Sequence, residues 1–202
     1  MAYSNQRLLP QKVQDGFIRL LSPLVKQFSK WGLSPNTFTI AGVIITFIGA
    51  AAFLSGFIRW AGLLILLGGC CDTIDGLLAR TTGKASRFGA LLDSTVDRYA
   101  EFMMFSGIAG YFFYIDDFKT AAGTLLALCG SLMVSYSRAR AESLGMEAKS
   151  GFMQRPERVV LIGLGAIIHP DAFKWAIWIV AFGANITALQ RIRFAYKSDI
   201  SK

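Results

Sequence analysis

The sequence predicts an all-α integral membrane protein, with an N-terminal amphipathic interfacial helix followed by six transmembrane helices. Apolar residues make up 53% of the 202 residues and gather in long runs, as membrane spans require. Glycine is abundant, with 20 copies, as expected where transmembrane helices pack closely. Turn residues and charges separate six apolar runs, at roughly 36–57, 60–80, 87–115, 119–144, 156–169 and 171–195.

The N-terminal stretch 11–31 differs from these runs because its apolar residues occupy only one side of a helix. That side carries Val13, Phe17, Leu20, Leu21, Leu24, Val25 and Phe28. Such a pattern is typical of a helix that lies in the membrane surface, although an ordinary helix packed on the core remains an alternative. We therefore divide the chain into an N-terminal segment, 1–34, and a six-helix membrane domain, 35–202.

The basic residues are distributed as membrane topology predicts. The net charge is +8, and with the predicted spans every Lys and Arg falls on one side except Arg59, Lys119 and Lys174. The positive-inside rule then places both termini and the aspartate-bearing helix ends in the cytoplasm, in a multi-pass protein of the cell membrane. Because topology explains the positive charge, we expect the bilayer, and not nucleic acid, as the partner.

Four aspartates interrupt the apolar sequence between residues 72 and 97. The second span has only twelve apolar residues, Trp60 to Cys71, before Asp72. At a rise of about 1.5 Å per residue, Asp72 lies about 18 Å from the outer end, within a hydrocarbon core of about 30 Å. Charges at this depth are tolerated in a water-filled cavity, which we expect to open to the cytoplasm, and they mark function by default.

The spacing of the four aspartates predicts a metal site. Asp72 and Asp75 are three residues apart and Asp93 and Asp97 are four apart, so each pair projects from one face of its helix. Oxygen ligands of high charge suit Mg²⁺ or Mn²⁺, and two such ions per active site could clamp the oxygens of a phosphoryl displacement. Two alternatives remain: a buried ion-pair network with nearby arginines, and a divalent cation transporter.

The pattern also resembles a known family at eight fixed positions: Asp72, Asp75, Gly76, Ala79, Arg80, Gly89, Asp93 and Asp97. These residues, at these spacings, are the signature of the CDP-alcohol phosphatidyltransferases. The resemblance implies a six-helix membrane enzyme, usually a homodimer. It implies that a phosphatidyl group passes from a CDP-diacylglycerol-type lipid, ester- or ether-linked, to an alcohol, with release of CMP.

The resemblance also implies roles for individual residues. Asp72, Asp75, Asp93 and Asp97 would hold the metals, and Asp97 would be the catalytic general base. The donor lipid would be bound by residues of the first three spans and the connection between the second and third: Asn36, Thr39, Gly76, Ala79, Arg80, Ser86 and Gly89.

Arginines near three predicted helix ends indicate the acceptor. Arg138, Arg155 with Arg158, and Arg191 come from different helices, and guanidinium groups bind phosphate oxygens in bidentate fashion. Some of them could instead be anchors at the lipid headgroups. The segments around Ser135 and Arg155 resemble bacterial phosphatidylinositol-phosphate synthases and their archaeal ether-lipid relatives, which implies inositol 1-phosphate as acceptor. The predicted acceptor-binding residues are Ser135, Arg138, Arg155, Arg158 and Arg191.

The sequence departs from the resembled enzymes at one acceptor position, and a second acceptor alcohol is an alternative. Arg138 stands where the mycobacterial-type enzymes carry lysine, and arginine and lysine are not interchangeable at a tight phosphate site. Glycerol 3-phosphate also carries a phosphate, so a phosphatidylglycerophosphate synthase is the alternative function.

Overall fold

Seven helices form the part of the chain that the computed structural model describes, namely residues 8, 10–83, 86–146, 148 and 151–200. They are α1 (Gln11–Lys30), α2 (Pro35–Leu54), α3 (Ile58–Thr81), α4 (Arg87–Tyr114), α5 (Phe118–Ser143), α6 (Arg155–Ile168) and α7 (Pro170–Ile200). The predicted all-α fold class is confirmed. The largest difference is at the C-terminus, where α7 continues past the apolar run because its charged last turns remain helical.

Four of the described helices, α2, α3, α5 and α7, are long and apolar enough to cross a membrane. Exposed apolar side chains follow one stripe of α2: Ile40, Ile44, Phe47 and Ile48. The chain is therefore a multi-pass membrane protein. The prediction counted six spans. However, α6 has only 14 residues, and α4 carries Asp93, Asp97 and Glu101, so neither qualifies by length and composition alone.

Small residues bring α2 and α3 into close contact. A Cβ added at Gly42 of α2 would lie 3.2 Å from the backbone oxygen of Gly68 on α3 and 3.1 Å from the Cβ of Cys71. A larger side chain at Gly42 would push the two helices apart, as at the small-residue interfaces of other membrane helices. This contact fixes the second half of α3, which bears two of the aspartates, against the start of α2.

The apolar core includes the end of the bundle opposite the aspartates. It contains Phe53 near the end of α2, Ile65 in the first half of α3, and Phe112 near the end of α4. Phe53 stacks on Phe173, at the start of α7, with 5.3 Å between ring centroids. Because short turns make consecutive helices antiparallel neighbours, this packing sets the start of α2, the end of α3 and the start of α4 together at the other end.

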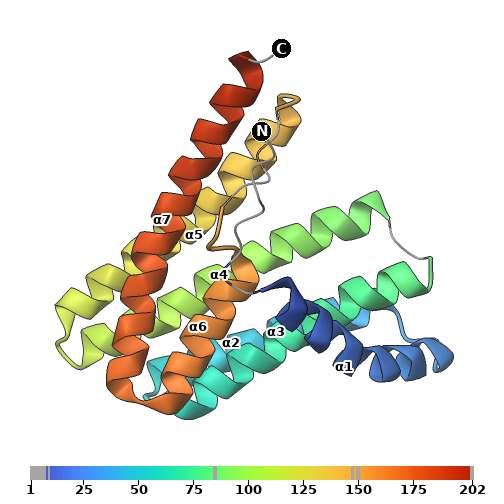
Figure 1. Cartoon of the computed structure of the whole chain (residues 1–202). Helices are drawn as coiled ribbons and strands as arrows, with labels where there is room; N and C mark the ends of the chain where they lie inside the picture. Colours follow the sequence, from blue (N-terminus) through green and yellow to red (C-terminus); the bar gives the residue numbers. More distant parts are fainter. Residues whose placement is uncertain (1–7, 9, 84–85, 147, 149–150, 201–202) are drawn as a thin grey trace.

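Figure 1 shows two groups of helices joined by α6 and by the contact of α4 with α5. Helices α2, α3 and α4 pack together, and α1 lies against α3. Helices α5 and α7 run side by side and extend away from the first group, while α6 contacts both α3 and α7. The position of α6 between the groups places its N-terminus near the aspartates.

Helix α1 uses part of its apolar side to pack on α3. Leu21 and Val25 are buried against Ile74 and Leu78 of that helix. Leu20 on the same side is 72% exposed. The predicted helix is thus present, and only part of its apolar side is covered by the protein. Residues 1–7 and 9 of the predicted N-terminal segment lie outside the described residues.

Candidate active site

Three of the four predicted metal ligands form one cluster. Asp72 and Asp75 project from the second half of α3 and Asp93 from the start of α4. Each offers a carboxylate oxygen, and these oxygens all lie within 4.8 Å of one another. The spacing of three along α3 therefore places both aspartates on the face directed toward Asp93, as predicted from helix geometry.

The residues of this cluster fit a hard divalent cation. The donors are carboxylate oxygens alone, the ligand type preferred by Mg²⁺ and Mn²⁺. Oδ1 of Asp93 is buried and accepts no hydrogen bond from the described residues. Because buried carboxylate oxygens normally have a partner, an oxygen of this kind beside two further carboxylates is suited to bind a cation.

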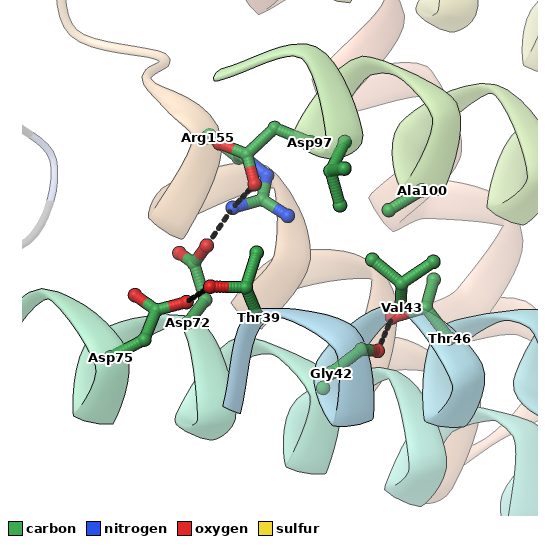
Figure 2. A pocket seen from close by; sticks show the side chains of 11 residues that line it. Thr39, Gly42, Val43, Thr46, Asp72, Asp75, Asp97, Ala100 and Arg155 are labelled. Atoms are coloured by element: carbon green, nitrogen blue, oxygen red, sulfur yellow. Dashed lines mark hydrogen bonds and ion pairs between the residues drawn. The ribbon is translucent and has the colours of Figure 1, made fainter. Parts of the chain in front are cut away.

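Thr39 of α2 holds one of these carboxylates in place. Its hydroxyl donates a hydrogen bond of 2.7 Å to Oδ2 of Asp75, which is only 6% exposed (Figure 2). The family resemblance implied a donor-lipid role for Thr39, and the contact with Asp75 was not predicted. The sequence does place a threonine on the span next to the aspartates, but it does not identify which aspartate the threonine contacts.

Arg155, the first residue of α6, lies inside the carboxylate site. Its Nη1 is 2.7 Å from Oδ1 of Asp72 and 2.7 Å from Oδ1 of Asp97 (Figure 2). Asp97 also lies 3.5 Å from Arg98. The predicted fourth metal ligand, Asp97, is outside the set of three whose oxygens lie within 4.8 Å of one another, and Arg155 bridges it to Asp72. A predicted acceptor residue and the predicted general base are thus in direct contact.

A cavity of about 210 Å³ opens beside the carboxylates. Its lining comes from the start of α2, the second half of α3 and the start of α4, and includes Asp75 and Asp93. All seven residues predicted to bind the donor lipid line it: Asn36, Thr39, Gly76, Ala79, Arg80, Ser86 and Gly89. Ser86 is also the N-cap of α4, since its hydroxyl accepts a hydrogen bond of 2.9 Å from the Gly89 amide.

The other predicted acceptor residues fall into two groups. Arg191 of α7 is buried and reaches across to α5, where Nη1 donates a hydrogen bond of 2.5 Å to the carbonyl of Val134, next to Ser135. Arg138 lies on the same helix as Ser135 and pairs with Glu142 at 2.9 Å. Ser135, Arg138 and Arg191 thus lie at the contact between α5 and α7, whereas Arg155 lies with the carboxylates.

Arg158 does not have the place expected of an acceptor ligand. Its side chain is 0% exposed and pairs with Glu101 of α4, which is 1% exposed. A fully buried and paired guanidinium cannot contact a soluble acceptor, so the acceptor role predicted for Arg158 is not supported. Glu101 lies outside the eight signature positions, and the structure identifies Arg158 as its partner.

A model of the CDP-alcohol phosphatidyltransferase family matches residues 32–187. The chain belongs to this family. The match runs from just before α2 well into α7, so it includes the carboxylate cluster, the adjoining cavity and α6. The family membership predicted from eight residues is confirmed, and with it the assignment as a metal-dependent transferase of phospholipid biosynthesis.

Among phosphatidyltransferases of this family, named relatives from bacteria and archaea are similar over almost their whole length. The phosphatidylinositol phosphate synthase of Mycobacteroides abscessus is 32% identical over 186 residues, 89% of this chain and 84% of the relative. The archaetidylinositol phosphate synthase of Pyrococcus horikoshii is 36% identical over 187 residues, 92% of this chain and 96% of the relative.

Crystal structures of the phosphatidylinositol phosphate synthase of Mycobacterium tuberculosis have the same fold. The complex with bound CDP-DAG superposes with a TM-score of 0.81 at 31% identity, covering 89% of this chain and 95% of that one. The complex with manganese and citrate has a TM-score of 0.80 at 31% identity, covering 87% and 88%.

Proposed function

We propose that this protein transfers a phosphatidyl group, ester- or ether-linked, from a CDP-diacylglycerol-type lipid to inositol 1-phosphate. The products are phosphatidylinositol phosphate and CMP. The observation that carries the proposal is the contact of Arg155 with Asp97 at 2.7 Å. It places a group suited to bind an acceptor phosphate next to a carboxylate suited to take a proton, beside the cavity of the predicted donor lipid.

Three sets of residues support the donor half of the reaction. The seven predicted lipid-contacting residues line one cavity, which Asp75 and Asp93 also border. Arg80 in that cavity can donate charge-assisted hydrogen bonds to a pyrophosphate. Asp72, Asp75 and Asp93 would hold Mg²⁺ or Mn²⁺, two ions per site when Asp97 joins them, and bound metal neutralises the charge of the pyrophosphate.

Asp97 is the proposed general base. Its carboxylate is 15% exposed and hydrogen-bonded to Arg155 through Oδ1, so it is held where an acceptor bound to Arg155 would place its hydroxyl. Asp97 accepts the hydroxyl proton, and the acceptor oxygen forms a bond to the phosphorus that bears the diacylglycerol. The bond from that phosphorus to the bridging oxygen breaks, and CMP leaves with that oxygen.

The acceptor assignment combines the arginines with the names of the relatives. Arg155, Arg138 and Arg191 are proposed to bind the acceptor phosphate together with Ser135, and this set comes from α5, α6 and α7. The relatives named phosphatidylinositol phosphate synthase and archaetidylinositol phosphate synthase support inositol 1-phosphate as the acceptor that all four residues bind.

For the membrane arrangement we propose six spans, with α4 and α6 as the fifth and sixth members of the set. Helix α6, with 14 residues, is about 21 Å long, shorter than a hydrocarbon core of about 30 Å. Its N-terminus, with Arg155, then lies below the membrane surface at the depth of the aspartates. The exposed apolar residues of α1 support an interfacial position for that helix.

The remaining proposals follow from charge and family. The basic residues near the aspartate-bearing helix ends support a cytoplasmic active site and cytoplasmic termini in the cell membrane. We propose residues 35–202 as the catalytic membrane domain, residues 1–34 as its N-terminal segment, and a homodimer as the assembly.

An acceptor panel tests the function. Purified protein in detergent receives CDP-diacylglycerol, Mn²⁺ or Mg²⁺, and in parallel inositol 1-phosphate, glycerol 3-phosphate, inositol or serine, and CMP release is followed. We expect turnover with inositol 1-phosphate alone. Turnover with glycerol 3-phosphate instead would overturn the acceptor assignment, and absence of metal-dependent CMP release with every acceptor would overturn the proposed reaction.

A further inference from the structure

Two ion pairs join α4 to α6, one turn apart. The first, Asp97 with Arg155, lies in the candidate active site, and the second, Glu101 with Arg158, lies directly behind it. Glu101 follows Asp97 by four residues and Arg158 follows Arg155 by three. The two acids therefore share one face of α4, and the two arginines share one face of α6. The two pairs therefore connect the same two helix surfaces.

The second pair is completely enclosed by protein. Nε and Nη2 of Arg158 donate to Oε1 of Glu101 at 2.8 Å and 2.5 Å, and its Nη1 donates to the Met153 carbonyl at 3.0 Å. The two side chains are 0% and 1% exposed. A planar guanidinium with three fixed hydrogen bonds tolerates little displacement, so Arg158 determines how the N-terminus of α6 sits against α4.

The same arrangement extends to α7 through the loop before α6. The amide of Met153 donates a hydrogen bond of 3.1 Å to Oγ1 of Thr187, which is fully buried. Gly151, with φ of +119°, turns the chain at this point, and a side chain there would overlap Thr187. Arg158 therefore holds together α4, the loop and, through that loop, α7.

These contacts lie between the two halves of the site. The cavity for the donor lipid is lined by residues of α2, α3, α4 and their connections, whereas Arg155 belongs to α6 and Arg191 to α7.

We propose that Glu101 and Arg158 are positioning residues: their buried pair fixes α6 against α4 and thereby places Arg155 between Asp72 and Asp97. The inference rests on the proposed function, in which Arg155 binds the acceptor. Neither Glu101 nor Arg158 contacts a substrate in this account. Their loss should therefore affect acceptor use and turnover while leaving the donor-lipid cavity as it is.

The test uses a double substitution, Glu101→Met with Arg158→Met, because replacing both members of a buried ion pair by apolar residues often leaves stability unchanged or raised. The full chain in detergent is assayed for CMP release with the acceptor that gives the highest wild-type turnover, and its thermal unfolding is measured. We expect a folded protein whose kcat falls about 100-fold, since displacements of about 1 Å have effects of this size, and whose acceptor KM rises. The KM for CDP-diacylglycerol should stay within about twofold.

Two further variants and a control complete the design. Arg158→Lys keeps the charge but loses the planar guanidinium, so kcat should fall and the acceptor KM should rise by less than in the double variant. Glu101→Gln keeps one acceptor oxygen, and we expect the same smaller changes. Lys174→Gln removes a distant ion pair with Asp117 and should leave the kinetics unchanged.

The outcomes separate this proposal from the proposed function. Wild-type kinetics in the folded double variant, an equal change of both KM values, or unfolding of all three pair variants would overturn the positioning role. Failure of the wild-type protein to use any phosphorylated acceptor would instead count against the proposed function. Because the assay uses the best wild-type acceptor, an error in acceptor identity leaves the positioning test intact.

Discussion

The hydroxyl of Thr39 donates a 2.7 Å hydrogen bond to Asp75, across the contact between α2 and α3. Asp75 is only 6% exposed, and a buried carboxylate depends on such donors for its orientation. The close approach of the two helices at Gly42 makes the contact possible. A threonine on a neighbouring helix therefore orients a predicted metal ligand.

Thr39→Val should weaken Mn²⁺ binding by about tenfold or more, because a hydrogen bond to a charged group contributes about 1.5–3 kcal/mol. Thr39→Ser keeps the hydroxyl and should bind Mn²⁺ nearly as the wild type does. Binding is measured by titration of the purified protein with Mn²⁺. Equal affinities for the valine and serine variants would contradict the assigned contact.

Asp93→Asn should raise the Mn²⁺ concentration required for half-maximal CMP release and weaken direct Mn²⁺ binding. The reason is that Oδ1 of Asp93 has no other partner among the described residues and the substitution removes one charge from the cluster. Asp171→Asn, at the start of α7 and away from the site, serves as the matched control. An unchanged metal dependence in Asp93→Asn would remove this residue from the ligand set.

Asp97→Asn should lower turnover by about 10²–10⁴-fold, the usual contribution of a general base. Affinity for CDP-diacylglycerol should change little, because Asp97 does not line the donor-lipid cavity. The measurement combines steady-state CMP release with equilibrium binding of the donor lipid. Substantial residual turnover would rule out Asp97 as the base.

Arg155→Lys should raise the acceptor KM and lower kcat even though the positive charge remains. One guanidinium atom contacts both Asp72 and Asp97, and the compact lysine ammonium on its flexible stem does not reproduce that planar geometry. Arg155→Ala should have the larger effect, since it also leaves the two carboxylates without their shared cation. Donor-lipid KM is the internal control, and a parallel change in it would contradict an acceptor role.

Asp117→Ala should destabilise the protein by about 1 kcal/mol, as loss of an N-cap does. Asp117 caps α5 through the Thr120 amide at 3.1 Å and pairs with Lys174 at 2.6 Å. The hydrogen bond from Lys174 lowers the pKa of Asp117, with smaller contributions from Thr120. Because the pKa is lower in the folded state, this stabilisation is complete above the usual aspartate value of about 3.9 and is lost as the pH falls through the folded value.

The check for Asp117 is thermal unfolding of wild type and variant across pH. Their difference in Tm should be constant near neutral pH and shrink below about pH 4. A difference that persists unchanged in strong acid would show that Asp117 is not the titrating group. Lys174→Gln should reproduce only part of the effect, since the Thr120 contacts remain.

Local features of the sequence were sufficient for the helices and for the carboxylate cluster. Pro35 starts α2 as its fixed φ favours, and Asp72 with Asp75 share a face because their spacing of three matches the helical period. Seven residues assigned to the donor lipid by resemblance line a single cavity. For the first two features the decisive information lies within one helix, whereas the cavity residues come from α2, α3, α4 and the connection before α4 and required the family resemblance.

Pairings between residues that are distant in the sequence could not be predicted from it. Arg155 and Arg158 are three residues apart and chemically identical, yet one enters the carboxylate site and the other is buried against Glu101. Many pairings of acids and arginines satisfy charge neutrality, and only tertiary packing selects among them. The difference between the six predicted spans and the four helices that qualify alone also depends on tertiary packing, because α4 and α6 carry charges that neighbouring helices cover.

The donor-lipid cavity is lined entirely by residues between 35 and 93, while Ser135, Arg138, Arg155 and Arg191 all follow residue 118. In the proposed assignment, the donor lipid and the acceptor alcohol are therefore bound by two consecutive portions of one polypeptide. A recombinant chain that keeps residues 1–117 and takes the remainder from a relative with another acceptor alcohol would retain the nucleotide-lipid specificity and exchange the alcohol. New headgroups can arise in such a protein without alteration of the part that recognises CDP-linked lipids.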